Sequence, residues 1–195
     1  MKNTGIYLFD DVEVLDFAGP FEVFSVTSEL NNFELLKVFT ISKNGQMIKA
    51  VNGLNIQPDH SFDSHPEIDI LIIPGGAGTR TEMKDDSVLQ WVKNNFDKSE
   101  ITFSVCSGSR ILGTLGLLDG IESVTHHEVI EDMKAISPAV IIKENARFAD
   151  NGKIMTSGGI SAGIDLSLHV IKKLFGKEIM NKTIKYMEYG NWEEI

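Results

Sequence analysis

The stretch "ITFSVCSGSRILGTLGLLDG", residues 101–120, joins an apolar run to a helical pattern through the only cysteine of the chain, Cys106. The run 101–105 is typical of a buried strand, and residues 107–118 carry apolar side chains at helical spacing. Gly108 follows the cysteine by two residues. A strand that passes directly into a helix is the basic unit of an α/β sheet. The stretch therefore predicts a thiol at the corner between the two elements.

Strand and helix patterns alternate along the rest of the chain. The predicted strands are short apolar runs closed by turn residues, and the segments between them have the period of amphipathic helices. Gly19-Pro20 opens the first predicted helix, since proline is well tolerated in a first turn. This alternation indicates an α/β fold with a mostly parallel sheet sandwiched by helices. Further strands are predicted within 6–9, 33–42 and 68–76, and further helices within 86–96, 160–175 and 177–188.

Two Asn-Gly turns, Asn52-Gly53 and Asn151-Gly152, predict β-hairpins. The first closes a hairpin over 47–57, and the second joins two strands within 139–159. We expect both hairpins to decorate the edges of the sheet. No linker, low-complexity tract or internal repeat divides the sequence, so residues 1–195 are predicted to form a single domain.

Charge and cysteine content narrow the classes of function. The formal net charge is -10, which disfavours nucleic acid and anionic membranes as partners, because phosphate binding needs clustered Lys and Arg. A single cysteine cannot form an internal disulfide and fits a reducing compartment. Neither a leader peptide nor an apolar run of membrane-spanning length is recognisable. We therefore expect a cytoplasmic protein.

Cys106 has the position of a nucleophile in an α/β enzyme. In the nucleophile elbow G-x-S-x-G a tight turn lifts the side chain above the sheet, although Ser104 replaces the first glycine here. A helix N-terminus stabilises negative charge, so we expect the pKa of the Cys106 thiol to be depressed. A pKa of about 5.5 would leave nearly all of the thiol as thiolate at neutral pH. The alternative is an inert cysteine that fills a gap in the core.

Glycines mark three predicted strand ends, at 74–78, 104–108 and 156–159. Ligands of open α/β sheets sit at the carboxyl ends of strands, at a topological switch point. The first of these segments, PGGAG, lacks both the Lys-Ser/Thr of a P-loop and the GxGxxG spacing of a dinucleotide site. Its backbone amides are expected to approach a small ligand as an oxyanion hole, the alternative being a plain tight turn.

Asp16 lies between Leu15 and Phe17, just ahead of the first predicted helix. An aspartate in that position is most often a helix cap or a turn former. The functional alternative is a carboxyl that faces the site, with a pKa raised by burial and by a neighbouring thiolate, and that carries a proton.

The histidines indicate no metal site, because HExxH and CxxC spacings are absent. His126 and His127 follow a predicted strand, and a Cys–His pair would explain an activated thiol. In an extended segment at most one of the two points inward. His60 and His65 lie in a polar loop, and His169 lies in an apolar helix. We expect neither a metal nor a cofactor.

Taken together, the motifs resemble the ThiJ/PfpI superfamily of the class I glutamine amidotransferase-like fold. The opening and final motifs are most similar to the isonitrile hydratase branch, which itself resembles the ligand domain of some AraC-type regulators. The resemblance implies a flavodoxin-like sheet and a homodimer. It rests on "LDFAGPFEVF" (15–24), "DILIIPGGAGT" (69–79), "FSVCSGSRILGTLGLLDG" (103–120), "VTHH" (124–127) and "TSGGISAGIDLSLHVI" (156–171).

The same resemblance implies roles for individual residues. Cys106 matches the family nucleophile, and Asp16 matches the acidic residue that hydrogen-bonds its sulfur. Ser107 stands where protease-like members carry a histidine, which disfavours peptidase chemistry, and His127 replaces the Trp of the hydratase "T-H-W" segment. The residues implied to face the substrate, two of them through backbone amides, are Gly75, Gly76, Ser107 and His126.

The combined interpretation is a cofactor-free hydratase or hydrolase that acts on a small carbon electrophile. Its most concrete form is hydration of an isonitrile to an N-substituted formamide through a thioimidate on Cys106. The alternatives are a glutathione-independent glyoxalase, an intracellular protease- or amidase-related enzyme, and a non-catalytic redox or ligand sensor. A whole AraC-type regulator is not expected, because the chain ends at Ile195, directly after its last predicted helix.

Overall fold

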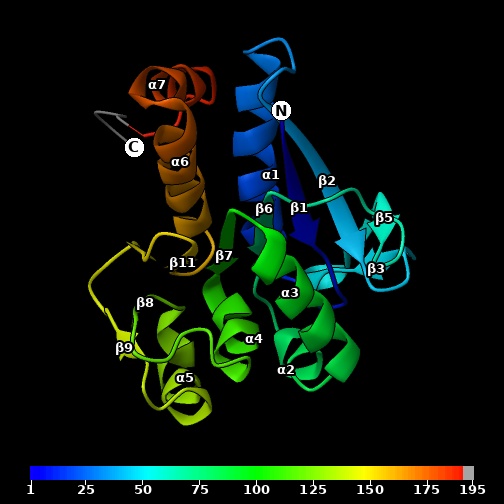
Figure 1. Cartoon of the computed structure of the whole chain (residues 1–195), viewed down its shortest axis with the longest axis vertical. Coiled ribbons are helices and arrows are strands. Elements are labelled where there is room, and N and C mark those ends of the chain that lie inside the picture. Colours follow the sequence, from blue (N-terminus) through cyan, green and yellow to red (C-terminus); the bar gives the residue numbers. More distant parts are fainter. Residues whose placement is uncertain (191–195) are drawn as a thin grey trace.

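The computed structural model describes residues 1–190 and contains a central seven-stranded sheet (Figure 1). The strand order is β10-β11-β7-β6-β1-β2-β5, and neighbours pair in parallel except for the antiparallel pair β10 and β11. The predicted α/β class with a mostly parallel sheet is confirmed. The strands of this sheet are β1 (Lys2–Tyr7), β2 (Leu36–Ser42), β5 (His60–Ser61), β6 (Ile70–Ile73), β7 (Ile101–Val105), β10 (Phe148–Asp150) and β11 (Ile154–Ser157).

Helices cover both faces of the sheet. On one face, Phe24 of α1 packs against Phe103 of β7 with ring centroids 6.3 Å apart, and α1 also contacts α6 and α7. Ile6 of β1 shares the register of Phe103, so the next residue, Tyr7, points to the opposite face. There it packs against Trp91 of α3 at 5.4 Å. The α-helices are α1 (Val14–Glu29), α2 (Thr79–Glu82), α3 (Asp86–Lys98), α4 (Ser109–Thr114), α5 (Ile130–Ile136), α6 (Ala162–Phe175) and α7 (Lys177–Tyr186).

Short elements complete the fold. Two small sheets pair β3 (Ile48–Lys49) with β4 (Asn55–Ile56) and β8 (Glu122–Ser123) with β9 (Ile141–Ile142). Single 3₁₀ turns occupy Val51–Gly53, Cys106–Gly108 and His127–Val129. Within residues 1–190, no helix combines the length and the apolar character needed to cross a bilayer.

Both predicted hairpins form, but they differ in their relation to the main sheet. The hairpin β3–β4 turns through Asn52 and Gly53, both at positive φ, and makes a separate small sheet. In the hairpin over Asn151-Gly152, β10 is the antiparallel edge strand, whereas β11 pairs in parallel with β7. The expectation that both hairpins decorate the edges of the sheet was therefore wrong for the second one, because its strand β11 lies between β10 and β7 inside the sheet.

The first helix begins earlier than predicted. It starts at Val14, so Pro20 lies inside α1 and Asp16 lies in its first turn. Proline lacks the N–H that would bond to the carbonyl four residues earlier. The buried side chains of Phe17 and Phe24 hold α1 against the sheet in spite of this loss. The prediction that the helix opens at Gly19-Pro20 was wrong, because burial outweighed the local signal.

The carboxyl ends of β1, β6, β7 and β11 meet at one edge of the sheet, and the segments after them pack closely. Residue Val12 forms an isolated bridge with Gly76. A Cβ atom on Gly108 would lie 2.2 Å from the Ile73 carbonyl oxygen, closer than any van der Waals contact allows. Cys106 N also donates to the Gly158 carbonyl oxygen at 3.1 Å, so the three glycine-marked strand ends of the sequence lie together.

We predict that Gly108→Ala destabilises the protein by about 1–3 kcal/mol, because the added methyl group must displace backbone rather than a flexible side chain. The matched control is Gly158→Ala, where the nearest atom to a built Cβ is the Ala162 methyl at an ordinary 3.6 Å. Urea unfolding followed by circular dichroism measures both. Equal stability of the two variants would contradict the close packing of the turn.

Candidate active site

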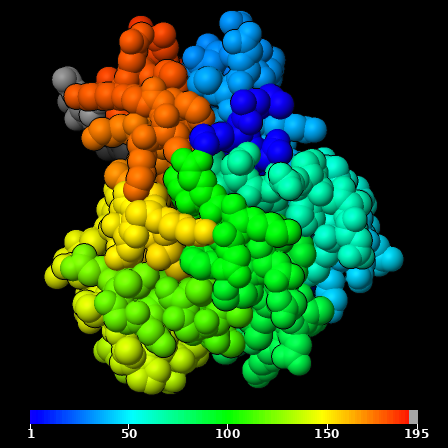
Figure 2. Space-filling model, in the orientation of Figure 1, coloured from blue at the N-terminus to red at the C-terminus, as the bar shows by residue number. Residues whose placement is uncertain are grey.

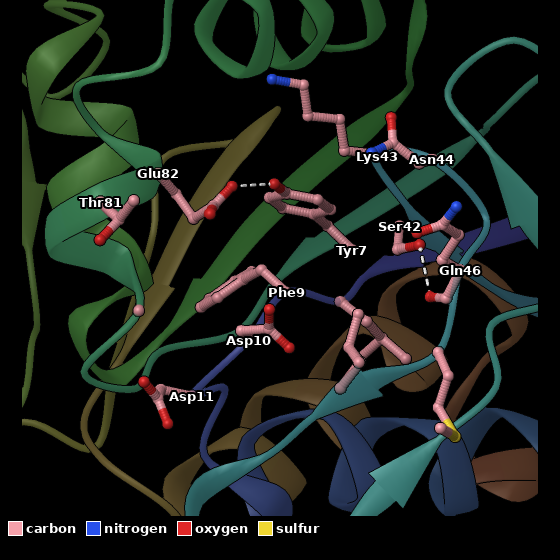
Figure 3. A pocket seen from close by; sticks show the side chains of 14 residues that line it. Tyr7, Phe9, Asp10, Asp11, Ser42, Lys43, Asn44, Gln46, Thr81 and Glu82 are labelled. Atoms are coloured by element: carbon pink, nitrogen blue, oxygen red, sulfur yellow. Dashed lines mark hydrogen bonds between the residues drawn. The ribbon is translucent and has the colours of Figure 1, made fainter.

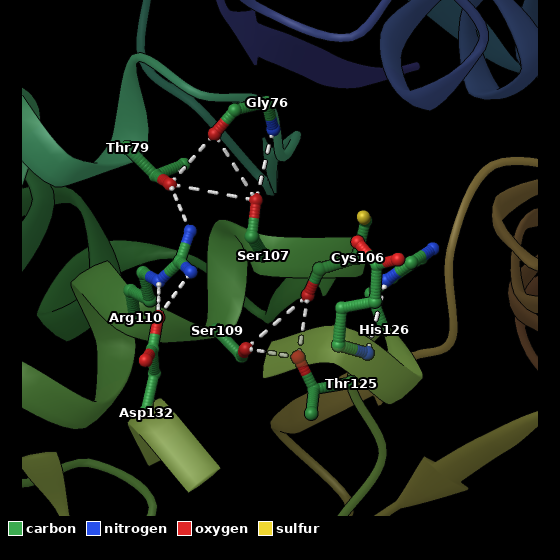
Figure 4. Close-up of polar contacts among 10 residues, drawn as sticks. Gly76, Thr79, Cys106, Ser107, Ser109, Arg110, Thr125, His126 and Asp132 are labelled. Atoms are coloured by element: carbon green, nitrogen blue, oxygen red, sulfur yellow. Dashed lines mark hydrogen bonds and ion pairs between the residues drawn. The ribbon is translucent and has the colours of Figure 1, made fainter. Parts of the chain in front are cut away.

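Cys106 occupies a sharp corner between β7 and α4. Its φ is +56°, in the left-handed region that costs a non-glycine residue roughly 1–3 kcal/mol. The 3₁₀ turn Cys106–Gly108 follows at once. Beneath it, Thr125 Oγ1 donates to the Cys106 carbonyl oxygen at 3.0 Å and pairs with Ser109 Oγ at 2.8 Å (Figure 4). These hydrogen bonds fix the backbone of the corner, and the sulfur lies at the edge of the sheet.

The thiol lines a cavity of about 320 Å³ and is itself only 8% exposed. The cavity wall combines backbone at Gly76 with charged side chains and the exposed side chain of Ile160. Its volume is at the lower end of the range for small-molecule sites. Cys106 is therefore accessible to a small reactant and is not sealed within the core.

Asp16 is fully buried and joins three separate segments of the chain. Its Oδ2 accepts a hydrogen bond from Gly75 N at 2.9 Å, and its Oδ1 accepts one from Ile160 N at 3.0 Å. The carboxyl also lies near the thiol of Cys106, and each of the two groups shifts the pKa of the other. The first turn of α1, the turn after β6, the turn after β11 and the elbow therefore meet at one side chain.

Burial raises the pKa of the Asp16 carboxyl to about 7, although the amides of Gly75 and Ile160 oppose this by stabilising the charged form. Burial also raises the pKa of the Cys106 thiol to about 12, and the negative charge of Asp16 adds to the increase. The Ser107 N–H lowers it, but by less. The direction of this shift is opposite to the depressed pKa expected from the sequence, because loss of solvation exceeds the effect of one short helix N-terminus.

The amides of Gly75 and Gly76 in the PGGAG turn are bonded within the protein. Gly75 N donates to Asp16, and Gly76 N donates to Ser107 Oγ at 2.9 Å (Figure 4). The expectation that the Gly76 amide is a free donor therefore does not match this geometry. Ser107 is the residue whose backbone N–H lies against the sulfur. The amides of Gly75 and Gly76 therefore position the carboxyl and the elbow.

A buried arginine supports this turn, and the sequence reasoning did not single it out. Arg110 of α4 is 3% exposed, and its Nη1 donates to Thr79 Oγ1 at 3.1 Å. Thr79 Oγ1 donates in turn to the Gly76 carbonyl oxygen at 2.8 Å. On its other side Arg110 pairs with Asp132 (Figure 4). The sequence signal that could have identified Arg110 is its charge next to the otherwise apolar run in "RILGTLG" (110–116).

Only one side chain of the His126–His127 pair faces the cavity, as the spacing predicted. His126 lines the cavity with Cys106, whereas the His127 side chain is 80% exposed. The Nδ1 atom of His126 accepts from Glu128 N at 3.3 Å, so a neutral ring carries its proton on Nε2. Of the other predicted site residues, Gly76 and Ser107 line the cavity, and Gly75 adjoins it through Asp16. Arg80 and Glu13 also line it and were not predicted.

Comparisons with known proteins find similarity over nearly the whole chain. The model of the DJ-1/PfpI family matches residues 2–173. The chain is 30% identical over 191 residues to an isonitrile hydratase of Pseudomonas putida, covering 96% of this chain and 78% of the relative. It is 29% identical to the HTH-type transcriptional regulator GbdR of Pseudomonas aeruginosa, over 91% of this chain, and spans about half, 48%, of that regulator. A ThiJ/PfpI family protein from Pseudomonas syringae superposes with a TM-score of 0.88 at 24% identity, covering 100% of this chain and 77% of the other.

We predict that alkylation of Cys106 by iodoacetamide is slow at pH 7 and accelerates by about tenfold per pH unit up to pH 9, because the reactive thiolate is a small minority below its pKa of about 12. Since the chain has one cysteine, mass spectrometry of the intact protein reports this residue alone. Glutathione treated in parallel corrects for the reagent. A rate that is constant between pH 6 and pH 9 would show a resting thiolate instead.

Proposed function

This chain belongs to the DJ-1/PfpI family, and from that premise we propose that it is a cysteine-dependent hydratase or hydrolase of small electrophiles, most concretely of isonitriles. One observation carries the proposal. The buried Asp16 carboxyl lies beside the Cys106 thiol, near enough for each group to shift the other's pKa, at the edge of a 320 Å³ cavity. A nucleophile and an adjacent proton acceptor within hydrogen-bond reach are the elements of covalent catalysis.

In the first step the Asp16 carboxylate accepts the thiol proton as the sulfur attacks. The Sγ atom of Cys106 forms a bond to the terminal carbon of the isonitrile, which carries a lone pair and an electrophilic orbital. Asp16 then donates its proton to that same carbon. Sulfur and hydrogen have thereby added to one carbon, and a thioimidate is attached to the enzyme. A carboxyl with a pKa of about 7 suits this step, because it both accepts and donates near neutral pH.

In the second step water adds to the thioimidate carbon. Asp16 accepts a proton from the water and donates it to the imine nitrogen, which leaves a neutral tetrahedral adduct with nitrogen, a hydroxyl group and sulfur on one carbon. The adduct's hydroxyl gives its proton to Asp16 as the carbonyl forms and the carbon–sulfur bond breaks, and Asp16 returns that proton to the sulfur. The product is an N-substituted formamide, and the balance of the cycle is one isonitrile and one water consumed. The Ser107 N–H supports the sulfur when it carries negative charge.

Similarity to GbdR makes a ligand-binding role in a longer protein the second candidate. The cavity with its charged wall supports that reading as well as catalysis. A redox-sensor role is less well supported, because sensor cysteines carry a low pKa and the pKa of Cys106 is raised. Binding of small molecules without turnover, across isonitriles and 2-oxoaldehydes, would favour the ligand-binding candidate over either enzyme.

We predict that Cys106→Ala abolishes formamide production from a simple alkyl isonitrile and that Asp16→Asn lowers kcat/KM by roughly 10²–10⁴-fold. The matched control, Asp86→Asn, changes an exposed carboxylate of α3 outside the Cys106 cavity and should retain full activity. Formamide is quantified by mass spectrometry, and circular dichroism checks that each variant folds. Unchanged turnover in Cys106→Ala would contradict the proposal. Lactate formed from methylglyoxal, without isonitrile hydration, would identify the activity as that of a glyoxalase instead.

We predict that kcat/KM rises with pH and reaches a plateau above about pH 7, because the carboxylate form of Asp16 accepts the thiol proton and predominates above its pKa. The measurement is the initial rate between pH 5 and pH 9 at substrate concentrations well below KM. The Asp16→Asn variant should lack this inflection. Activity that falls as the pH rises through 7 would mean that the protonated carboxyl is the active form.

A further inference from the structure

Arg110 lines the Cys106 cavity and is only 3% exposed, although it carries a full positive charge. Its ion-pair partner is Asp132, whose side chain is 46% exposed and so stays partly in water. A buried ion pair often contributes no more to stability than apolar side chains of similar size would. The next two residues, Ile111 and Leu112, are apolar and fully buried. Stability alone therefore does not explain a guanidinium at this position.

The guanidinium of Arg110 joins two helices that are separate in the sequence. On one side its Nη1 donates to Thr79 Oγ1, in α2, at 3.1 Å. On the other side its Nε donates to Asp132 Oδ2, in α5, at 3.1 Å, and Nη2 bonds to the same oxygen. Figure 4 shows the guanidinium between these two side chains. Because a guanidinium is a rigid planar group with fixed donor directions, it sets the separation of its two partners.

The helix α2 is fixed at both of its ends. At its start Thr79 Oγ1 donates to the Gly76 carbonyl oxygen at 2.8 Å. At its end Glu82 accepts a hydrogen bond from the buried hydroxyl of Tyr7, in β1 (Figure 3). The cavity in Figure 3, of about 310 Å³, borders α2 and shares no lining residue with the Cys106 cavity. The residues on this side of the Cys106 cavity, here called the first wall, are Gly76, Ala77 and Arg80.

The second wall of the Cys106 cavity is formed by His126, Glu128 and Val129. Polar contacts hold it at both ends. Before it, Thr125 Oγ1 donates to the Cys106 carbonyl oxygen at 3.0 Å. After it, Asp132 in the first turn of α5 bonds to Arg110. Of these two contacts, the one through Arg110 continues across to Thr79 and the first wall.

We propose that Arg110 is a positioning residue that fixes the width of the Cys106 cavity and thereby admits only small electrophiles to the sulfur. It acts through Thr79 on the first wall and through Asp132 on the second. Its importance for catalysis rests on the proposed function, because selection by size matters only where the thiol reacts with an external substrate. Alkylation of the thiol tests the width of the cavity whether or not an isonitrile is turned over.

Two uncharged reagents of different size measure access to Cys106. Iodoacetamide and iodoacetanilide share their reactive group, and the second carries an additional phenyl ring. Mass spectrometry of the intact protein, which has one cysteine, gives both rate constants at pH 8, and the same reaction of glutathione corrects for the reagents. After this correction we expect a preference for iodoacetamide of about tenfold or more, because close-packed walls yield little to a larger group. Equal corrected rates would overturn the proposal.

Variants of Arg110 separate geometry from charge. Arg110→Met should lower the preference to about threefold or less, and Arg110→Lys should do the same, because one ammonium keeps the charge but lacks the planar arrangement of donors. The rate with iodoacetamide itself should stay within about threefold of the wild-type rate, since burial still limits the ionisation of the thiol. Partial unfolding would instead raise the rates with both reagents. An unchanged preference in either variant would contradict the proposed role of the guanidinium.

Variants of the two partners test each contact separately. Thr79→Val and Asp132→Ala should each lower the preference for iodoacetamide. The matched controls are Thr27→Val, at a fully buried threonine whose hydroxyl bonds α1 to α7, and Glu131→Ala, at an exposed residue of α5; neither lines the cavity. Both controls should keep the wild-type preference. Circular dichroism checks folding, and Asp132→Ala carries the test if Arg110→Met is unfolded. A preference retained in both partner variants, or lost in the controls, would overturn the proposal.

Discussion

The structure depends on a single buried carboxyl, that of Asp16, and on the three groups that lie against it. Two backbone amides, from Gly75 and Ile160, donate to it, and the thiol of Cys106 completes the set. A buried carboxylate without such partners would be prohibitively unstable. Because the partners come from turns after three different strands, the carboxyl fixes the relative positions of those turns. The cavity beside the sulfur is lined by residues of these same turns, among them Gly76, Cys106 and Ile160.

This arrangement has a cost in stability that favours a functional interpretation. The pKa of Asp16 is about 7 in the folded protein, whereas the ordinary pKa of an aspartate is 3.8, so the folded state binds the proton more tightly. Below pH 3.8 this tighter proton binding adds about 4 kcal/mol to the free energy of unfolding, and the contribution is lost as the pH rises to about 7. The positive φ of Cys106 adds strain at the same place. Strained backbone and perturbed titrations that coincide at a cavity are typical of a reactive centre.

Much of the fold and the outline of the site could be predicted from the sequence, because strand periodicity and turn glycines are local signals. The corner at Cys106 and the convergence of the glycine-marked strand ends follow from them, and the family resemblance adds Asp16. The raised pKa of Cys106, the bonded Gly76 amide and the buried Arg110 could not be predicted, because they depend on contacts between distant segments. The start of α1 was misjudged for the same reason. The single domain, the homodimer and the cytoplasmic location stay predictions.

The central claim is that a protonated thiol at rest faces a carboxyl that titrates near neutral pH. The most direct measurement is a ¹³C NMR titration of the Asp16 side-chain carboxyl between pH 3 and pH 9, assigned with the Asp16→Asn variant. The account predicts a midpoint near 7, well above that of exposed aspartates in the same spectrum. A midpoint near 4 would mean that the carboxyl is ionised throughout the neutral range and cannot act as a proton carrier, and the account would be contradicted.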